Sequence, residues 1–140
     1  MIQTGFYIGE RDWWIMATFG IKGSGDIAEV YHALLACGCP DYEARKACMV
    51  LSRKNSGYTF TNTEGRFTLM FASEADSPEE MFDTIDHELK HAVEHISGFY
   101  DIDPKSEDAA YLQGEIARNM FPAVALAVCP KCHNEEEEDD

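Results

Sequence analysis

Residues 77–98 read SPEEMFDTIDHELKHAVEHISG, and this stretch decides the fold expected for the chain. Ser77, Pro78 and Glu80 form a helix-start pattern, because the serine side chain caps the first turn and proline suits the first helical position. Gly98 is expected to end this helix in the left-handed conformation. The apolar residues recur at steps of three and four: Met81, Phe82, Ile85, Leu89, Ala92, Val93 and Ile96. That spacing predicts an amphipathic helix with one face turned toward a core.

The middle of this helix carries His87-Glu88-Leu89-Lys90-His91, a motif of the form H-E-x-x-H. Residues four apart share a face of a helix, so His87 and His91 can offer two imidazoles to one metal ion. Glu88 lies beside them, where it can take a proton from a water that the metal polarises. This pattern is the signature of zincin metalloproteases and predicts zinc-dependent peptide hydrolysis.

A second helix is predicted directly after the first. Asp103 is its expected N-cap, Pro104 its first residue, and Pro122 its end. The connection through residues 98–101 is short, so the two helices are expected to pack antiparallel. The first turn of the second helix then lies near the last turns of the motif helix.

Catalytic zinc usually has three protein ligands, so a third is expected outside the motif. Glu107 lies in the first turn of the second helix and is expected to face back toward His91. Asp108 points about 100° away around the helix, and Glu115 lies about two turns further along it. We therefore predict Glu107 as the third ligand; the alternative is an acidic residue favoured there by the helix dipole.

The motif and the following segment Ser106–Gly114, which reads SEDAAYLQG, together resemble the small single-domain gluzincins. They are most similar to compact H-E-x-x-H proteins of phage and prophage type, over about residues 30–121. In that group a Glu in an E-x-x-A-Y-like segment is the third zinc ligand, which also implies Glu107. The resemblance implies a minimal zincin-like core of α+β class, with an edge strand before the motif helix that pairs with an extended peptide substrate.

The rest of the chain supplies the other elements of such a core. Phe6–Phe19 is rich in aromatic and β-branched residues and predicts a strand or hairpin turning near Gly9–Asp12. Asp26 is the expected cap of a helix to about Cys37, and Pro40 with Asp41 opens another. Two short strands are predicted last: Tyr58–Thr61 and Arg66–Ala72, around a turn at residues 62–65.

Arg66–Ala72 is the strand expected to pair with the peptide, because strand addition supplies main-chain hydrogen bonds that do not depend on sequence. The alternative is an ordinary edge strand covered by the N-terminal segment.

Four further side chains are weaker candidates for the site. Tyr111, on the same face as Glu107, and Tyr100 are candidates to steady the oxyanion of the reaction, although such tyrosines more often pack. Asp83, one turn before the first motif histidine, is a candidate to orient that histidine. His95 follows the second by one turn and is either a fourth ligand or a residue of the surface or core edge.

Composition limits the classes of function. The chain has 140 residues, which suits one domain, expected at 1–128, followed by a segment 129–140 that ends in six acids and reads as a disordered tail. The net charge of −15 argues against nucleic acid. No apolar run approaches the ~18 residues of a membrane span. Five cysteines and the absence of a signal-peptide pattern favour the cytoplasm.

Three alternatives stay open. Glu29-x-x-His32 and Glu88-x-x-His91 together match the di-iron pattern of helix bundles. A lone C-x-x-C at Cys129 and Cys132 could join Cys37 and Cys39 in a second zinc site. The third alternative is a zinc-binding interaction or inhibitory module of the same fold with little or no peptidase activity, because a fold does not fix a function.

Overall fold

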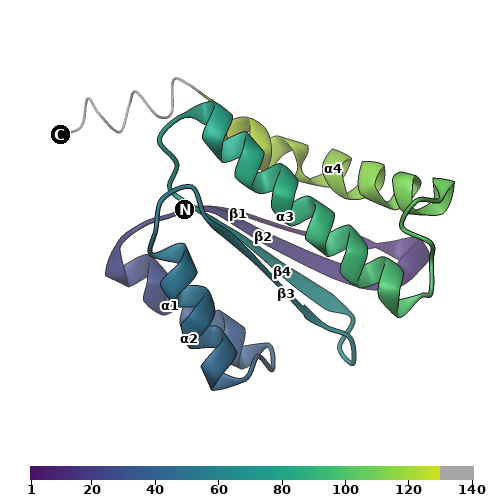
Figure 1. Ribbon diagram of the computed structural model, residues 1–140, viewed down its shortest axis with the longest axis horizontal. Coiled ribbons are helices and arrows are strands. Elements are labelled where there is room, and N and C mark those ends of the chain that lie inside the picture. The colour runs from purple at the N-terminus through teal and green to yellow at the C-terminus, as the bar shows by residue number, and fades with distance from the viewer. Residues whose placement is uncertain (130–140) are drawn as a thin grey trace.

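A computed structural model describes residues 1–129 of the chain (Figure 1). The fold consists of two hairpins, a helix pair between them and a second helix pair after them. In chain order the elements are β1 (Ile2–Ile8), a 3-10 turn (Gly9–Arg11), β2 (Trp13–Ile21), α1 (Gly23–Ala36), α2 (Asp41–Leu51), β3 (Gly57–Asn62), β4 (Phe67–Ser73), α3 (Pro78–Phe99) and α4 (Glu107–Ala127). The α+β class and the predicted order of elements are confirmed.

The four strands form one mixed sheet in the order β1-β2-β4-β3. Each hairpin is antiparallel, and the two hairpins join through parallel pairing of β2 with β4, where Met16 lies opposite Leu69. The prediction that Arg66–Ala72 is an edge strand is therefore wrong, because β4 lies between β2 and β3. The physical reason is burial of both faces of β4: residues 68–73 are all buried, as is typical of a central strand.

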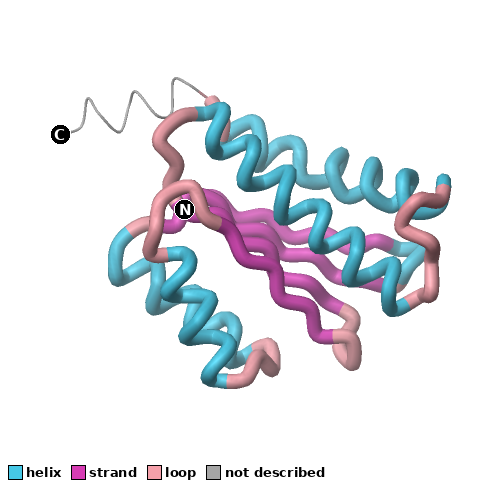
Figure 2. The backbone as a smooth tube through the Cα atoms, viewed as in Figure 1, coloured by secondary structure: helices cyan, strands magenta, loops and turns pink. Residues whose placement is uncertain are grey.

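The sheet separates two hydrophobic cores. Helices α3 and α4 cover one face, and α1 and α2 cover part of the other (Figure 2). The first core contains Trp13, Ile85 and Ile116, and the second contains Leu34 and Leu69. The pattern of strand β3 explains its position between the two layers, since Tyr58 and Phe60 alternate with Thr59 and Thr61. The apolar pair belongs to the second core, and the threonines face α3.

Helix starts follow local capping chemistry, with one exception. Ser77 caps α3 as predicted, its hydroxyl accepting from the backbone N–H of Glu80 at 3.1 Å. The predicted start of α1 at Asp26 is wrong, because α1 begins at Gly23. The Asp26 carboxylate instead reaches back to the backbone N–H of Lys22, the N-cap residue, at 3.0 Å. Asp26 thus supports the first turn from inside the helix.

The connection between α3 and α4 differs from the prediction at both ends. Gly98 stays helical, and the left-handed residue is Asp101, with a φ of 55°. Helix α4 begins at Glu107 with Ser106 as its N-cap, so the prediction of Asp103 in that role is wrong. Asp103 caps a turn, where its carboxylate accepts from the backbone N–H of Lys105 at 2.9 Å.

Pro122 lies inside α4, so the prediction that it ends this helix is also wrong. A proline in a helix interior removes one backbone hydrogen bond and costs about 3 kcal/mol. Burial of Met120, Ala123 and Ala127 against the first core offsets that cost and carries the helix on to Ala127.

Across the described part of the chain, none of the helices combines the length and apolar character needed to cross a membrane.

Candidate metal centre

His87 and His91 meet on the solvent side of α3. Their Nε2 atoms lie 3.1 Å apart, and the two rings are nearly perpendicular at 84°. Two nitrogens bound to one tetrahedral zinc ion at about 2.0–2.1 Å lie roughly 3.3 Å from each other. The observed separation fits that requirement, so the pair can hold one ion. The i, i+4 spacing of the motif is the local cause of this arrangement.

Glu88 completes the group but lies on a different side of the helix. Among residues 1–129, His87, Glu88 and His91 each offer one ligand atom, and these atoms all lie within 4.8 Å of one another. Glu88 is only 5% exposed, whereas His87 is exposed and His91 half-buried. The carboxylate therefore borders the histidine pair from the protein interior, which suits a group that exchanges a proton rather than one that is surrounded by water.

Strand β3 fixes the Glu88 side chain from two directions. The hydroxyl of Thr59 donates to Oε1 of Glu88 at 2.8 Å. Gly57, two residues earlier on the same face of the strand, leaves room for the carboxylate, since a Cβ at Gly57 would lie 2.6 Å from Cγ of Glu88. The buried carboxylate is thus hydrogen-bonded and sterically confined. Sequence reasoning did not assign Gly57 or Thr59 to the site. The available signal was the alternation in β3 of small or polar residues with the apolar Tyr58 and Phe60.

Replacing Gly57 by Ala should destabilise the protein by about 1–3 kcal/mol, because the new methyl group must displace Glu88 or the strand. Gly5→Ala is the matched control, since Gly5 also lies in a strand and its Cβ would meet its nearest neighbour at an ordinary 3.6 Å. Urea unfolding of both variants measures the difference. Equal free energies of unfolding for the two variants would mean that Glu88 is free to move away from β3.

Glu94 lies near the second ring nitrogen of His91. One of its carboxylate oxygens is 3.8 Å from Nδ1 of His91. Metal-bound histidines commonly place their other N–H toward a carboxylate, which orients the ring. Asp83, predicted for such a role, lines a groove beside His87 together with Glu94, Lys90 and Gln113 of α4. The groove brings Gln113 near His87, and no sequence pattern had marked that residue.

The residues predicted on α4 do not join the group. Glu107 is the first residue of α4 and is exposed, and its carboxylate is not part of the His87–Glu88–His91 cluster found within residues 1–129. Tyr111, the predicted oxyanion donor, is 73% exposed. The hydroxyl of Tyr100 donates a hydrogen bond to the backbone carbonyl of Arg11, so it points toward the first hairpin. The ligand role of Glu107 and the catalytic role of Tyr111 therefore stay predictions.

His95 contacts β3 rather than the histidine pair. Its Nδ1 lies 2.8 Å from the hydroxyl of Thr61, and its ring centroid lies 6.3 Å from that of His91. Burial, followed by the charge of His91, lowers the pKa of the His95 imidazole, although Glu94 and Glu43 oppose the shift. The environment of His95 therefore favours the neutral form of its ring.

The fold separates the residues of the two alternative metal sites. Glu29 and His32 belong to α1, which covers the opposite face of the sheet from α3, so the di-iron arrangement is wrong for this fold (Figure 1). Cys37 and Cys39 follow α1 on that same opposite face, whereas Cys129 follows α4. Cys132 and the tail to residue 140 lie outside the described residues.

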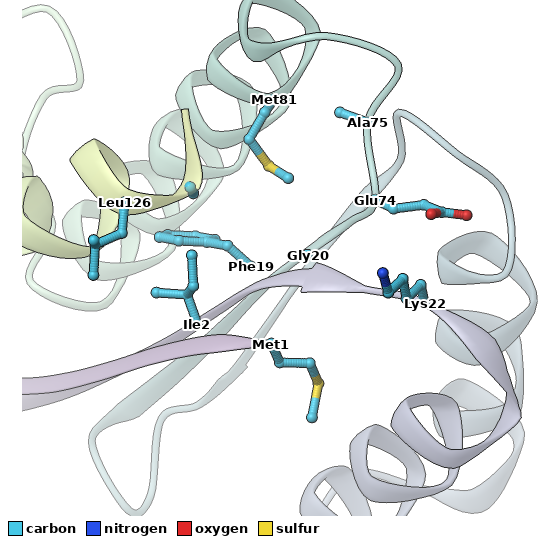
Figure 3. Close-up of a pocket in the computed structure, with 10 residues that line it drawn as sticks. Met1, Ile2, Phe19, Gly20, Lys22, Glu74, Ala75, Met81 and Leu126 are labelled. Atoms are coloured by element: carbon cyan, nitrogen blue, oxygen red, sulfur yellow. The ribbon is translucent and has the colours of Figure 1, made fainter. Parts of the chain in front are cut away.

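A different hollow lies near the start of α3, away from the histidine pair. Figure 3 shows four apolar residues around it, from β1, β2, α3 and α4 respectively: Ile2, Phe19, Met81 and Leu126. Its charged lining residues, Lys22 and Glu74, are of opposite sign. This hollow is lined mainly by apolar residues and has no histidine, so the candidate metal ligands are those of α3.

Comparison with known proteins found no match: the chain matches no protein-family model, no curated protein and no solved structure. We therefore infer the function from the geometry of α3 and β3.

Proposed function

We propose that this protein is a zinc-dependent peptidase whose site is the His87–Glu88–His91 group. One observation carries the proposal: two imidazole nitrogens lie 3.1 Å apart, and a buried carboxylate lies within 4.8 Å of both. When bound, zinc would polarise the scissile carbonyl and the attacking water. His87 and His91 would hold the ion.

Glu88 would act as the general base and then pass the proton to the leaving amine. A positioned base typically contributes 10²–10⁴-fold to the rate. Its hydrogen bond from Thr59 and the confinement by Gly57 support this role, because both keep the carboxylate in one position beside the histidines. Preset geometry of this kind lowers the cost of reaching the transition state.

The substrate would be a peptide or an unfolded protein segment in extended form. Strand β3 is an edge strand beside α3, and among residues 1–129 no further strand pairs with its outer side. An extended peptide can add to such an edge through main-chain hydrogen bonds. The proposed peptide-binding strand is therefore β3, whose threonines contact the motif helix. It is not β4, which the sequence had indicated.

The experiment that tests the proposal is incubation of the zinc-loaded protein with a broad peptide library, followed by mass spectrometry. New termini should appear with the wild-type protein and should be lost after the metal is chelated. If zinc binds but no peptide in the library is cleaved, a second candidate function replaces this one. That candidate is a zinc-binding interaction or inhibitory module, and the absence of Glu107 from the described ligand group favours it.

Glu107→Ala should weaken zinc binding at pH 7 more than Asp108→Ala or Glu115→Ala does. In the proposal Glu107 would be the third ligand, because two histidines alone hold zinc poorly. Competition with a chromogenic chelator measures all three variants side by side. A larger loss for Asp108→Ala or Glu115→Ala would move the third ligand to that residue.

A further inference from the structure

A chain of three hydrogen bonds runs from the core to His95. The indole Nε1 of Trp13 donates to the hydroxyl of Thr68 at 2.9 Å. That hydroxyl lies 2.9 Å from the hydroxyl of Thr61, which lies 2.8 Å from Nδ1 of His95. Trp13 and Thr68 are fully buried, at 0% exposure each. This series of hydrogen bonds crosses β2, β4 and β3 and ends on α3 beside the histidine pair.

The chemistry of the donors gives this chain a direction. An indole N–H can only donate, so Thr68 accepts from Trp13, and its own proton is free to be donated to Thr61. Thr61 in turn has its proton left to donate, and the unprotonated Nδ1 of His95 is its acceptor. With this direction of donation, each buried polar group in the series has a hydrogen-bond partner, as is usual for buried polar groups. The proton of a neutral His95 ring would then be on Nε2.

His95 also lines a hollow at the free edge of β3. The other residues around this hollow include Glu43, Tyr58, Thr59 and Thr61. A peptide that adds to β3 would pass through it, because the outer side of this strand is unpaired within residues 1–129. The ring of His95 is 6.3 Å from that of His91, which corresponds to roughly two residues of an extended chain at ~3.3 Å each.

We propose that the Trp13–Thr68–Thr61 chain fixes His95 as the Nε2–H tautomer, and that this N–H donates to a main-chain carbonyl of a peptide bound along β3. His95 is then a positioning residue for the substrate and not a metal ligand. This inference rests on the proposed function, because it assumes that the peptide lies beside the histidine pair. It names a substrate contact two residues away from the bond that is cut.

The tautomer can be tested without any substrate. Nitrogen-15 NMR of the zinc-loaded protein, with ring labels on histidine, should give His95 an unprotonated Nδ1 and a protonated Nε2 at pH 7.5. Thr61→Val should abolish this fixed tautomer, and Thr61→Ser should keep it because the hydroxyl remains. A protonated Nδ1 on His95 in the wild type would overturn the proposal.

The substrate contact is tested by binding rather than by cleavage. The probe is a library of acetylated and amidated octapeptides, captured on zinc-loaded Glu88→Gln protein and on the same protein with His95→Phe or His95→Gln. Loss of one hydrogen bond should weaken retention roughly 3- to 10-fold in His95→Phe, and His95→Gln should restore part of it through its amide N–H. Equal retention by the Phe variant, or no retention by Glu88→Gln itself, overturns the contact. Failure of the proposed function gives a different result: peptides bind, but the wild type cleaves none of them.

Discussion

Replacing Glu88 by Gln should lower peptide hydrolysis by about 10²–10⁴-fold, while zinc content and thermal stability stay close to those of the wild type. The amide has the shape of the carboxylate and can still accept the hydrogen bond from Thr59, which is 2.8 Å in the wild type. It cannot take a proton from water at neutral pH. The loss should therefore fall on kcat and leave KM little changed. Stopped assays on the peptide cleaved fastest in the library measure both constants.

The control for this variant is Glu79→Gln, which makes the same chemical change at an exposed position in the first turn of the same helix. It should keep the wild-type rate. If Glu88→Gln hydrolyses the peptide as fast as Glu79→Gln does, Glu88 is not the base and the proposed mechanism fails. Calorimetry of both variants separates a chemical loss from unfolding.

Local signals predicted α3 and its motif well. The cap at Ser77 depends on residues within one turn, and the apolar stripe follows from the helical period alone. The meeting of His87 and His91 also needs no long-range information, because spacing of four on a helix brings any two side chains together. The sequence could likewise place Glu88 beside the two histidines, but it could not identify Thr59 and Gly57, which hold Glu88 in place.

Contacts between distant segments were not predictable in the same way. The parallel pairing of β2 with β4 joins strands separated by two helices and β3, and it removes β4 from the edge. One signal existed, since Phe67–Ala72 lacks the alternation of polar and apolar residues expected of a half-exposed strand. At the start of α4 the difficulty was local, because Asp103-Pro104 and Ser106 are both capping patterns and the structure uses the second. The position of Glu107 relative to the motif histidines depends on this connection, so it could not be derived from local sequence signals.

The double substitution of His87 and His91 by Ala should remove bound zinc almost completely. Both Nε2 atoms of the 3.1 Å pair disappear, and the remaining member of the described group is a single buried carboxylate. A lone carboxylate does not meet the requirement of zinc for several N, S or O ligands. Elemental analysis after dialysis should give about one zinc per chain for the wild type and close to none for the variant.

The matched control is His32→Ala, because His32 lies on α1 across the sheet and should not affect zinc content. Both motif histidines lie on the solvent side of α3, so their loss should leave the cores and the melting temperature of the metal-free protein nearly unchanged. Binding of the ion stabilises only the folded chain, so added zinc should raise the melting temperature of the wild type and not that of the double variant. If the double variant keeps its zinc, the ligands lie elsewhere in the chain and His87 and His91 are not among them. If it loses zinc but still cleaves peptides, hydrolysis does not depend on this metal centre, and the peptidase proposal must be abandoned for α3.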